Sequence, residues 1–349
     1  MNFALSDDQL AMRDSLRRYL VDEPTPSWRG LCDLGLMAAL MTEEQGGIGG
    51  KGRDIALVFE ELGRACVTSP ALQCFMSLGC KTGMEQDIIL GTVVIAPALY
   101  EESSRYGLAN PQTSAVWLNG TEPVSVVITG RKIVVPDEGP ADYLIVSTQS
   151  QQSPTLFLVP ARSSGINKQR YGSIDGQGFS NFEFAGVEVG TDNMLECSVH
   201  ALVIRGLLAI GAEALGLMDA VRDMTVEYLK QRRQFGKQLS DFQVLQHRLA
   251  DMAMAIEQVR SSVINAAEAF DQHDSREYVE FHALKHQVGE VGRLVAEEAI
   301  QLHGAIGMTQ DYSLGKYAKR LIMLDHLLGD SDWHLTQFGD LTQRRAAHE

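Results

Sequence analysis

A basic cluster in the C-terminal half of the chain has residue types that can bind a phosphate. Lys230, Arg232 and Arg233 follow an apolar helical pattern, and Phe235 and Gly236 come shortly after them. The guanidinium group of an arginine presents a planar fork of N–H donors that matches the oxygens of a phosphate. This patch can face a bound phosphate, although the net charge of −15 argues against nucleic acid as a partner.

Two helices must position this cluster. Apolar residues recur at three- and four-residue steps before it and form one stripe along a helix: Leu215, Met218, Val221, Met224 and Tyr228. The cations of the cluster complement the negative end of that helix, and Gly236 can adopt the left-handed conformation that ends a helix. We expect Ser240 or Asp241 to cap a second helix, whose apolar side includes Val244, Leu245, Leu249 and Met252.

These residues resemble the C-terminal signature of acyl-CoA dehydrogenases. The resemblance rests on three runs: Arg232-x-x-Phe235-Gly236-Lys237, Phe242-Gln243-x-x-Gln246 and Leu249-Ala250-Asp251-Met252. A second block, Gln301-Leu302-His303-Gly304-Ala305-Ile306-Gly307, has the form of that family's Gln-x-x-Gly-Gly-x-Gly segment. Two blocks in the right order and at the right separation make a specific match.

The patterns along the chain follow the domain order of that family. Residues 1–90 have helical periodicity, residues 91–195 contain short β-rich runs, and residues 196–349 are helical again. The resemblance implies an α+β fold that is mostly α, with an N-terminal helical domain, a small central β-barrel-like domain and a C-terminal four-helix bundle. We expect three domains with these bounds.

Local signals predict individual elements. Ser6 with Gln9 forms a capping box before the first helix. Asn119-Gly120 and Thr129-Gly130 have the composition of hairpin turns. Further helices are expected over Trp28 to Met41, Gly52 to Ala65, Ser69 to Gly79, Arg276 to His303 and Ser313 to Phe338.

Cysteine usage and hydropathy indicate the compartment. The odd number of cysteines and the lack of any C-x-x-C pair favour reduced core thiols and no metal site; the five are Cys32, Cys66, Cys74, Cys80 and Cys197. No Lys/Arg-led apolar run opens the chain, and no stretch of about 20 residues is uniformly apolar. We therefore expect a cytoplasmic protein without a membrane partner.

The resemblance implies FAD as the cofactor, acyl-CoA as the substrate and electron-transfer flavoprotein as the electron acceptor. In the family's tetramers, one subunit's β domain holds the flavin ring and the neighbour's C-terminal bundle holds the nucleotide end. Arg232 matches the family arginine that meets the flavin pyrophosphate, and Ala305 replaces a common glycine. The residues expected to bind the cofactor are Arg232, Gln234, Phe235, Gln243, Gln301, Gly304 and Ala305.

The half of the site that faces the flavin ring departs from the family pattern. Tyr100-Glu101-Glu102-Ser103-Ser104 stands where members usually carry Thr-Glu-Pro and a following Gly-Ser. Val134-Val135-Pro136-Asp137 stands where they carry Trp-x-Thr or Trp-x-Ser. Valine and proline can neither stack on the ring nor donate a hydrogen bond to it, so these segments are also consistent with plain β turns.

Neither family position for the catalytic base holds a carboxylate. Alignment through Lys319 and Arg320 places Leu328 at the usual glutamate, and the second known position, on the first bundle helix, offers Gly206 and Leu207. Possible substitutes are Glu213, Asp325 and Asp330, each of which also has a structural interpretation as a cap or an ion-pair partner.

Retention of the nucleotide-facing residues with loss of the base predicts a supporting subunit. Such a chain completes its partner's FAD site in an α2β2 acyl-CoA dehydrogenase that forms an α,β-unsaturated acyl-CoA. The run Asp330-Ser331-Asp332-Trp333-His334 resembles heteromeric bacterial members, some of which act on steroid side-chain CoA thioesters. Two alternatives stay open: a self-sufficient homo-oligomeric dehydrogenase with a relocated carboxylate, and a flavin-free scaffold that uses the bundle as an interaction surface.

Overall fold

The chain folds into two compact units. The computed structural model describes residues 5–118, 125–150, 154–272 and 279–348. Unit 1 comprises Met1–Pro26, Lys51–Val67 and Leu207–Glu349, and unit 2 comprises Ser27–Gly50 and Thr68–Gly206. Helices, then strands, then helices follow one another along the chain, so the mostly α fold with a central sheet is confirmed. The division at residues 90 and 195 stays a prediction.

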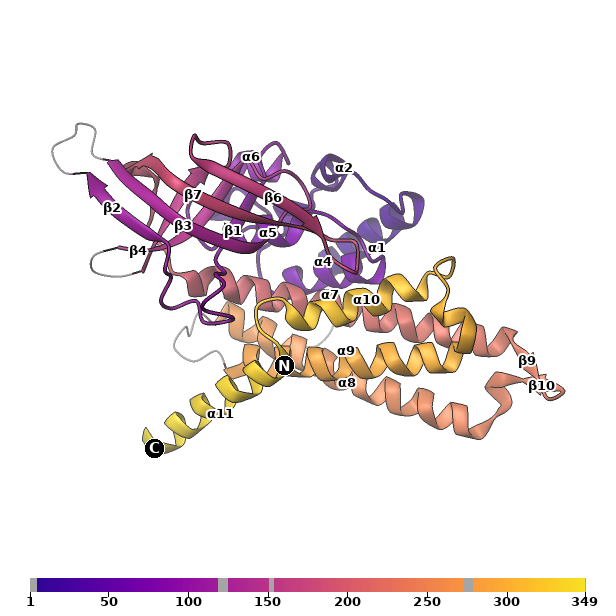
Figure 1. Ribbon diagram of the computed structural model, residues 1–349. Coiled ribbons are helices and arrows are strands. Elements are labelled where there is room, and N and C mark those ends of the chain that lie inside the picture. Colours follow the sequence, from indigo (N-terminus) through magenta and orange to yellow (C-terminus); the bar gives the residue numbers. More distant parts are fainter. Residues whose placement is uncertain (1–4, 119–124, 151–153, 273–278, 349) are drawn as a thin grey trace. The chain divides into compact units, whose positions relative to one another are not determined.

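Unit 1 is a helical assembly around the long helix α7 (Figure 1). Its helices are α1 (Asp7–Asp22), α4 (Gly52–Arg64), most of α7 (Val199–Gln231), α8 (Gln243–Asp271), α9 (Val279–His303), α10 (Leu314–His326) and α11 (Ser331–His348). Helix α9 packs against α8, α10 and α11, while α4 packs against α1 and α8. A Cβ atom at Gly216 of α7 would lie 1.9 Å from the carbonyl oxygen of Glu60 in α4. The backbones of the two helices are therefore in direct contact there, which only glycine permits.

Helix α7 is the core helix of unit 1. Among the described residues it alone is long and apolar enough to cross a membrane, and 83% of its most apolar window is buried inside the protein. A helix that is apolar on all sides is buried in the core of a large protein or in a bilayer. Its burial here is that of a core helix.

Unit 2 is built on an eight-stranded sheet with the order β6-β7-β3-β2-β4-β5-β8, and β1 pairs with β4 in parallel. The strands are β1 (Ile95–Ala98), β2 (Ser114–Leu118), β3 (Ser125–Pro136), β4 (Tyr143–Gln149), β5 (Pro154–Pro160), β6 (Ile166–Gly172), β7 (Gly178–Gly190) and β8 (Met194–Leu195). Its helices are α2 (Trp28–Asp33), α3 (Leu36–Ala39), α5 (Ala71–Ser77) and α6 (Glu85–Ile89), and α5 packs against β1. Phe157, Phe182 and Phe184 belong to the apolar core on the sheet.

Several expected elements differ from the observed ones. The capping box of Ser6 and Gln9 is confirmed. The expected helix from Trp28 to Met41 is wrong: it is two short helices, because Gly35 adopts a left-handed conformation with φ of 92°. The Asn119-Gly120 turn lies outside the described residues.

The expected turn at Thr129-Gly130 is also wrong. Both residues lie inside strand β3, which pairs with β7 along almost its whole length. A register shift between Ile128 and Thr129 marks a bulge, whose extra residue is Gly186 on β7, with a φ of 72°. The Thr129-Gly130 pair therefore lies within a paired strand, opposite a bulge in β7, rather than in a hairpin turn.

The last expected helix, from Ser313 to Phe338, is broken into α10 and α11. Leu328 and Gly329 both have positive φ, 58° and 114°. A left-handed residue cannot continue a right-handed helix, so the chain turns between the two helices. A leucine in this conformation gives no sequence signal, which is why the break was not predicted.

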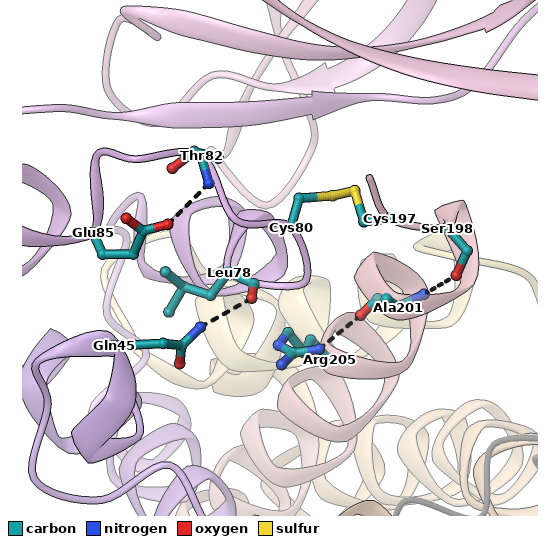
Figure 2. Close-up of a disulfide and its surroundings, with 9 residues drawn as sticks. All are labelled: Gln45, Leu78, Cys80, Thr82, Glu85, Cys197, Ser198, Ala201 and Arg205. Atoms are coloured by element: carbon teal, nitrogen blue, oxygen red, sulfur yellow. Dashed lines mark hydrogen bonds between the residues drawn. A yellow bond between two sulfur atoms is a disulfide. The ribbon is translucent and has the colours of Figure 1, made fainter. Parts of the chain in front are cut away.

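A disulfide bond corrects the expectation that all cysteines are reduced core thiols. Cys80, after α5, is bonded to Cys197, just before α7, with their Cα atoms 5.3 Å apart (Figure 2). These residues are 117 positions apart in the sequence, so their spacing carries no information about the pairing. Cys32, Cys66 and Cys74 remain buried thiols, and burial raises the pKa of Cys32 and of Cys74 to about 12.

Candidate functional site

The predicted phosphate-binding cluster forms a hairpin at one end of unit 1. Helix α7 ends at Gln231, and β9 (Arg233–Gln234) pairs antiparallel with β10 (Lys237–Gln238). The two residues between the strands, Phe235 and Gly236, have φ values of 52° and 81°. Left-handed conformations at both central positions are those of the two-residue hairpin turn that matches strand twist. The expected left-handed Gly236 therefore belongs to this turn, five residues beyond the helix end.

Arg232 stands at the stem of the hairpin. Its backbone N–H donates to the carbonyl of Tyr228 at 2.9 Å, and its carbonyl accepts from the N–H of Leu239 at 2.9 Å. The side chains of Arg232 and Gln234 are exposed, and Phe235 is 86% exposed at the tip. Within the part of the chain that the structure describes, the guanidinium of Arg232 has no carboxylate partner. An anchored backbone thus presents an unpaired cation to solvent.

The cap of the following helix differs from the expected one. Asp241 accepts a hydrogen bond from the backbone N–H of Gln238 at 3.2 Å and so caps a 3-10 turn, Leu239–Asp241. Helix α8 begins only at Gln243, with Phe242 at its N-cap. The prediction that Ser240 or Asp241 caps the second helix is therefore wrong, because the short turn intervenes. Gln243 becomes the first helical residue and is exposed.

The second predicted block lies at the junction of α9 and the 3-10 turn Gly304–Met308. Gly304 has a φ of 65°, and a Cβ placed on it would meet nothing within 4 Å. Gln301, Gly304 and Ala305 are all exposed. This junction and the β9–β10 hairpin lie at the same end of the helical bundle of unit 1 (Figure 1). The structure thus brings the two blocks to one end of unit 1, with exposed cationic and amide donors and open space at a glycine.

A buried histidine lies beside these exposed residues. His303, two residues after Gln301, is 3% exposed and stacks on Tyr228 at a centroid distance of 4.5 Å. His303 belongs to the second block, but the sequence pattern alone assigns it no role. The available signal was its position directly between two residues with expected roles, Gln301 and Gly304.

The segment 100–104 of unit 2 is engaged in internal contacts. The carboxylate of Glu101 accepts hydrogen bonds from the backbone N–H groups of Gln112 and Thr113, from the Thr113 hydroxyl at 2.7 Å and from the Lys132 ammonium at 2.7 Å. Burial lowers the pKa of Lys132 to about 8, although Glu101 acts to raise it. Burial also acts to raise the pKa of Glu101, but the hydrogen bonds from Lys132 and Thr113 leave that pKa below its usual value.

The segment 134–137 is engaged in the same way. The N–H of Val134 donates to the side chain of Asn181 at 3.2 Å, and Val134 has a φ of 53° at a register shift in β3. The Asp137 carboxylate accepts from Ser180 at 2.7 Å and pairs with Lys168 at 2.8 Å. Glu101 and Asp137, one carboxylate from each segment, are thus buried and paired inside unit 2.

The position aligned with the usual catalytic glutamate is a closed turn. Leu328 is buried, and its carbonyl accepts a hydrogen bond from His334 Nε2 at 3.0 Å. The ammonium of Lys285 donates to the carbonyls of Asp325 at 2.7 Å and Gly329 at 2.5 Å. Burial lowers the pKa of Lys285 to about 8, although Asp325 and Asp330 act to raise it. The carbonyl groups of Asp325 and Gly329 in and beside this turn therefore accept hydrogen bonds from the buried Lys285 ammonium.

The structure places the three substitute carboxylates in separate structural contacts. Oε1 of Glu213 lies 2.6 Å from Nε of Arg320, and both residues are 6% exposed. Asp325 accepts from the N–H of Ser331 at 2.9 Å, and Asp330 accepts from the N–H of Trp333 at 2.9 Å. Each carboxylate thus caps a helix or neutralises a cation, and their role as a base stays a prediction.

Sequence comparison decides the family. The profile of the acyl-CoA dehydrogenase N-terminal domain matches residues 6–86, and that of the acyl-CoA dehydrogenase C-terminal domain matches residues 205–340. The chain belongs to the acyl-CoA dehydrogenase family. Its members are FAD-dependent oxidoreductases that act on acyl-CoA, so the expected cofactor of the family is confirmed.

Individual acyl-CoA dehydrogenases match over nearly the whole chain. A probable acyl-CoA dehydrogenase of Bacillus subtilis, YngJ, is 27% identical over 95% of this chain and 97% of its own length. The solved steroid acyl-CoA dehydrogenase Tcur3481-Tcur3483 is 26% identical, with a TM-score of 0.88 over 98% of this chain and 99% of that one. The ChsE4-ChsE5 complex from Mycobacterium tuberculosis, 20% identical, shares the fold with a TM-score of 0.87 over 97% of this chain and 98% of that one.

Proposed function

We propose that this chain is the supporting subunit of an α2β2 FAD-dependent acyl-CoA dehydrogenase and completes the FAD site of a homologous partner. The observation that carries the proposal is the contrast between its two sets of cofactor-facing residues. The expected nucleotide-binding residues at the end of the bundle are exposed, whereas Glu101 and Asp137, in the segments expected to face the ring, are buried in ion pairs. FAD, when bound, accepts the hydride that leaves the β-carbon of the acyl-CoA.

The exposed residues at the end of the bundle have the chemistry needed to bind the nucleotide end of FAD. The Arg232 guanidinium can form two parallel hydrogen bonds to phosphate oxygens, and its backbone is anchored at both its N–H and its carbonyl. Gln234, Gln243 and Gln301 add amide donors and acceptors. The open space at Gly304 allows close approach of a ligand to the backbone. These residues would hold a dinucleotide and carry out no bond-making step.

The inward-folded set argues against a flavin ring on this chain's own sheet. Lys132 and Glu101 satisfy one another in the interior of unit 2, and opening that segment to a ligand would leave a buried charge unpaired. Position 328, where members usually carry the catalytic glutamate, holds a leucine. A chain with this distribution supports chemistry that takes place on a partner.

Two of the similar solved proteins support a proposal for the substrate class. One of them is a steroid acyl-CoA dehydrogenase and another is the two-component ChsE4-ChsE5 complex. We therefore propose steroid side-chain CoA thioesters as the substrate. We also propose electron-transfer flavoprotein as the electron acceptor, as the family resemblance implies, and the cytoplasm as the compartment.

The test compares the lone chain with the chain co-expressed with a homologous partner. FAD content is measured from the flavin absorbance of each preparation. We expect the lone chain to carry little FAD and the complex to carry it. Arg232→Ala should lower the FAD content of the complex, whereas Arg293→Ala, which removes an exposed arginine of α9 paired with Glu290, should not. A lone chain with full flavin content and turnover would refute the proposal.

A further inference from the structure

Three aromatic residues connect the helix ends that carry the two cofactor-facing blocks. Tyr228 is in the last turns of α7, His303 is the last residue of α9, and Tyr312 lies just before α10. The His303 ring stacks on Tyr228 with an interplanar angle of 23°, and its Nε2 lies 3.1 Å from the hydroxyl of Tyr312. We call Tyr228, His303 and Tyr312 the aromatic bridge.

The contacts of His303 define its tautomer. Its Nδ1 lies 2.8 Å from the carbonyl of Ala299, and because a carbonyl can only accept, Nδ1 carries the proton. Nε2 is then an acceptor and receives the hydrogen bond of the Tyr312 hydroxyl. Burial lowers the pKa of His303, although the bond to Ala299 acts to raise it. The neutral ring therefore has one donor and one acceptor, and both are used.

The bridge is directly linked to both blocks. The carbonyl of Tyr228 accepts the backbone N–H of Arg232 at 2.9 Å, at the stem of the hairpin. His303 lies between Gln301 and Gly304 in the second block. The His303 ring thus packs between the end of α7 that carries the hairpin and the segment before α10.

We propose that His303 is a positioning residue that holds the Arg232 hairpin and the Gln301–Gly304 segment at the separation needed to grip one dinucleotide. This inference rests on the proposed function. A phenylalanine could keep the stacking on Tyr228, but only a ring with a donor and an acceptor also fixes its rotation through Ala299 and Tyr312. The bridge contributes to FAD affinity and takes no part in proton or hydride transfer.

The test measures the Kd of FAD for the deflavinated complex by flavin fluorescence. Tyr312→Phe removes one hydroxyl, and His303→Phe removes both hydrogen bonds while keeping a ring. We expect Tyr312→Phe to weaken FAD binding by about threefold to tenfold, the effect of losing one hydrogen bond, and His303→Phe to weaken it at least as much. At saturating FAD, kcat and the KM for acyl-CoA should stay within about twofold of the wild type, since catalysis does not involve the bridge.

A matched histidine provides the control. His286, on the same helix, also contacts a backbone carbonyl, that of Ser331 at 3.1 Å. His286→Asn should leave the Kd of FAD unchanged. If His303→Phe fails to fold, Tyr312→Phe carries the test, because it changes only a hydroxyl. A loss of kcat at saturating FAD equal to the loss in affinity would overturn the positioning role and indicate a general structural defect.

A double-variant cycle separates this inference from the proposed function. If the bridge acts through the hairpin, the effect of Tyr312→Phe on the Kd of FAD should largely disappear in an Arg232→Ala background. Should Arg232→Ala weaken FAD binding while Tyr312→Phe has no effect, only the positioning role fails. Should Arg232→Ala itself leave the Kd unchanged, the proposed function fails.

Discussion

The ammonium nitrogen of Lys132 lies 2.7 Å from Oε1 of Glu101, and the two side chains are 0% and 5% exposed. Glu101 belongs to the segment that the family resemblance predicts to face the flavin ring. Removing one partner of such a pair leaves an uncompensated charge in a low-dielectric interior, which is far more costly than losing an exposed pair.

Glu101→Gln should therefore destabilise the protein by about 3–5 kcal/mol in urea unfolding. The neighbouring pair Arg131–Glu102 gives a matched control, because its side chains are 48% and 65% exposed. Glu102→Gln should cost less than about 1 kcal/mol. Equal effects of the two variants would contradict the structural role assigned to Glu101.

Glu213→Gln tests whether the buried carboxylate of Glu213, on α7, stabilises the fold through its ion pair with Arg320. It would remove the buried carboxylate that pairs with Arg320 at 2.6 Å, so we expect a loss of about 3–5 kcal/mol in the free energy of unfolding. The exposed pair Arg29–Asp33 is the control, and Asp33→Asn should cost less than about 1 kcal/mol. Abolished turnover with unchanged stability would instead indicate a relocated catalytic base.

Acid should destabilise the turn at Leu328 through His334. Burial, together with the charges of Lys285 and His282, lowers the pKa of His334 to about 3. The unfolded chain binds a proton near pH 6.5 whereas the folded chain does not, so stability is lost as pH falls below 6.5. One such group contributes at most about 1.4 kcal/mol per pH unit.

Chemical unfolding between pH 6.5 and 4.5 measures this effect. His334→Gln keeps a side chain that can donate to the Leu328 carbonyl but cannot titrate. Its stability should depend less on pH over this interval than that of the wild type. An identical slope in both proteins would show that His334 is protonated in the folded state.

The disulfide of unit 2 should be detectable as missing thiols. The chain has five cysteines, and three of them remain thiols in the structure. Thiol titration of the denatured protein without reductant should therefore find three groups, rising to five after reduction. Cys197→Ser should lower the stability of the oxidised protein by about 2–4 kcal/mol. Five thiols without reductant would contradict the Cys80–Cys197 bond.

Much of the fold could be predicted because its signals are local. The Ser6 capping box and the helix from Gly52 to Arg64 follow from short-range patterns, and the structure shows both. The exposure of Arg232 and Gln301 also agrees with the site expected from the two blocks. Their contact with FAD stays a proposal.

The remaining features depend on contacts that a sequence pattern does not contain. Lys132 and Glu101 belong to residue types that are almost always exposed, and only the fold of unit 2 buries them together. The break at Leu328 requires a leucine with positive φ, stabilised by Lys285 and His334 from other helices. His303 lies inside the second block. Only the fold brings its ring into contact with Tyr228 and Tyr312, which are distant in the sequence or on another element.

The most direct test of the account is the FAD stoichiometry of the purified complex with its homologous partner. The flavin absorbance and the protein concentration of one preparation give the ratio. If the Arg232 hairpin of this chain binds the partner's FAD and the chain binds no flavin ring on its own sheet, the complex should contain one FAD for every two chains. One FAD for every chain would show that its own strands hold a flavin and would contradict the account.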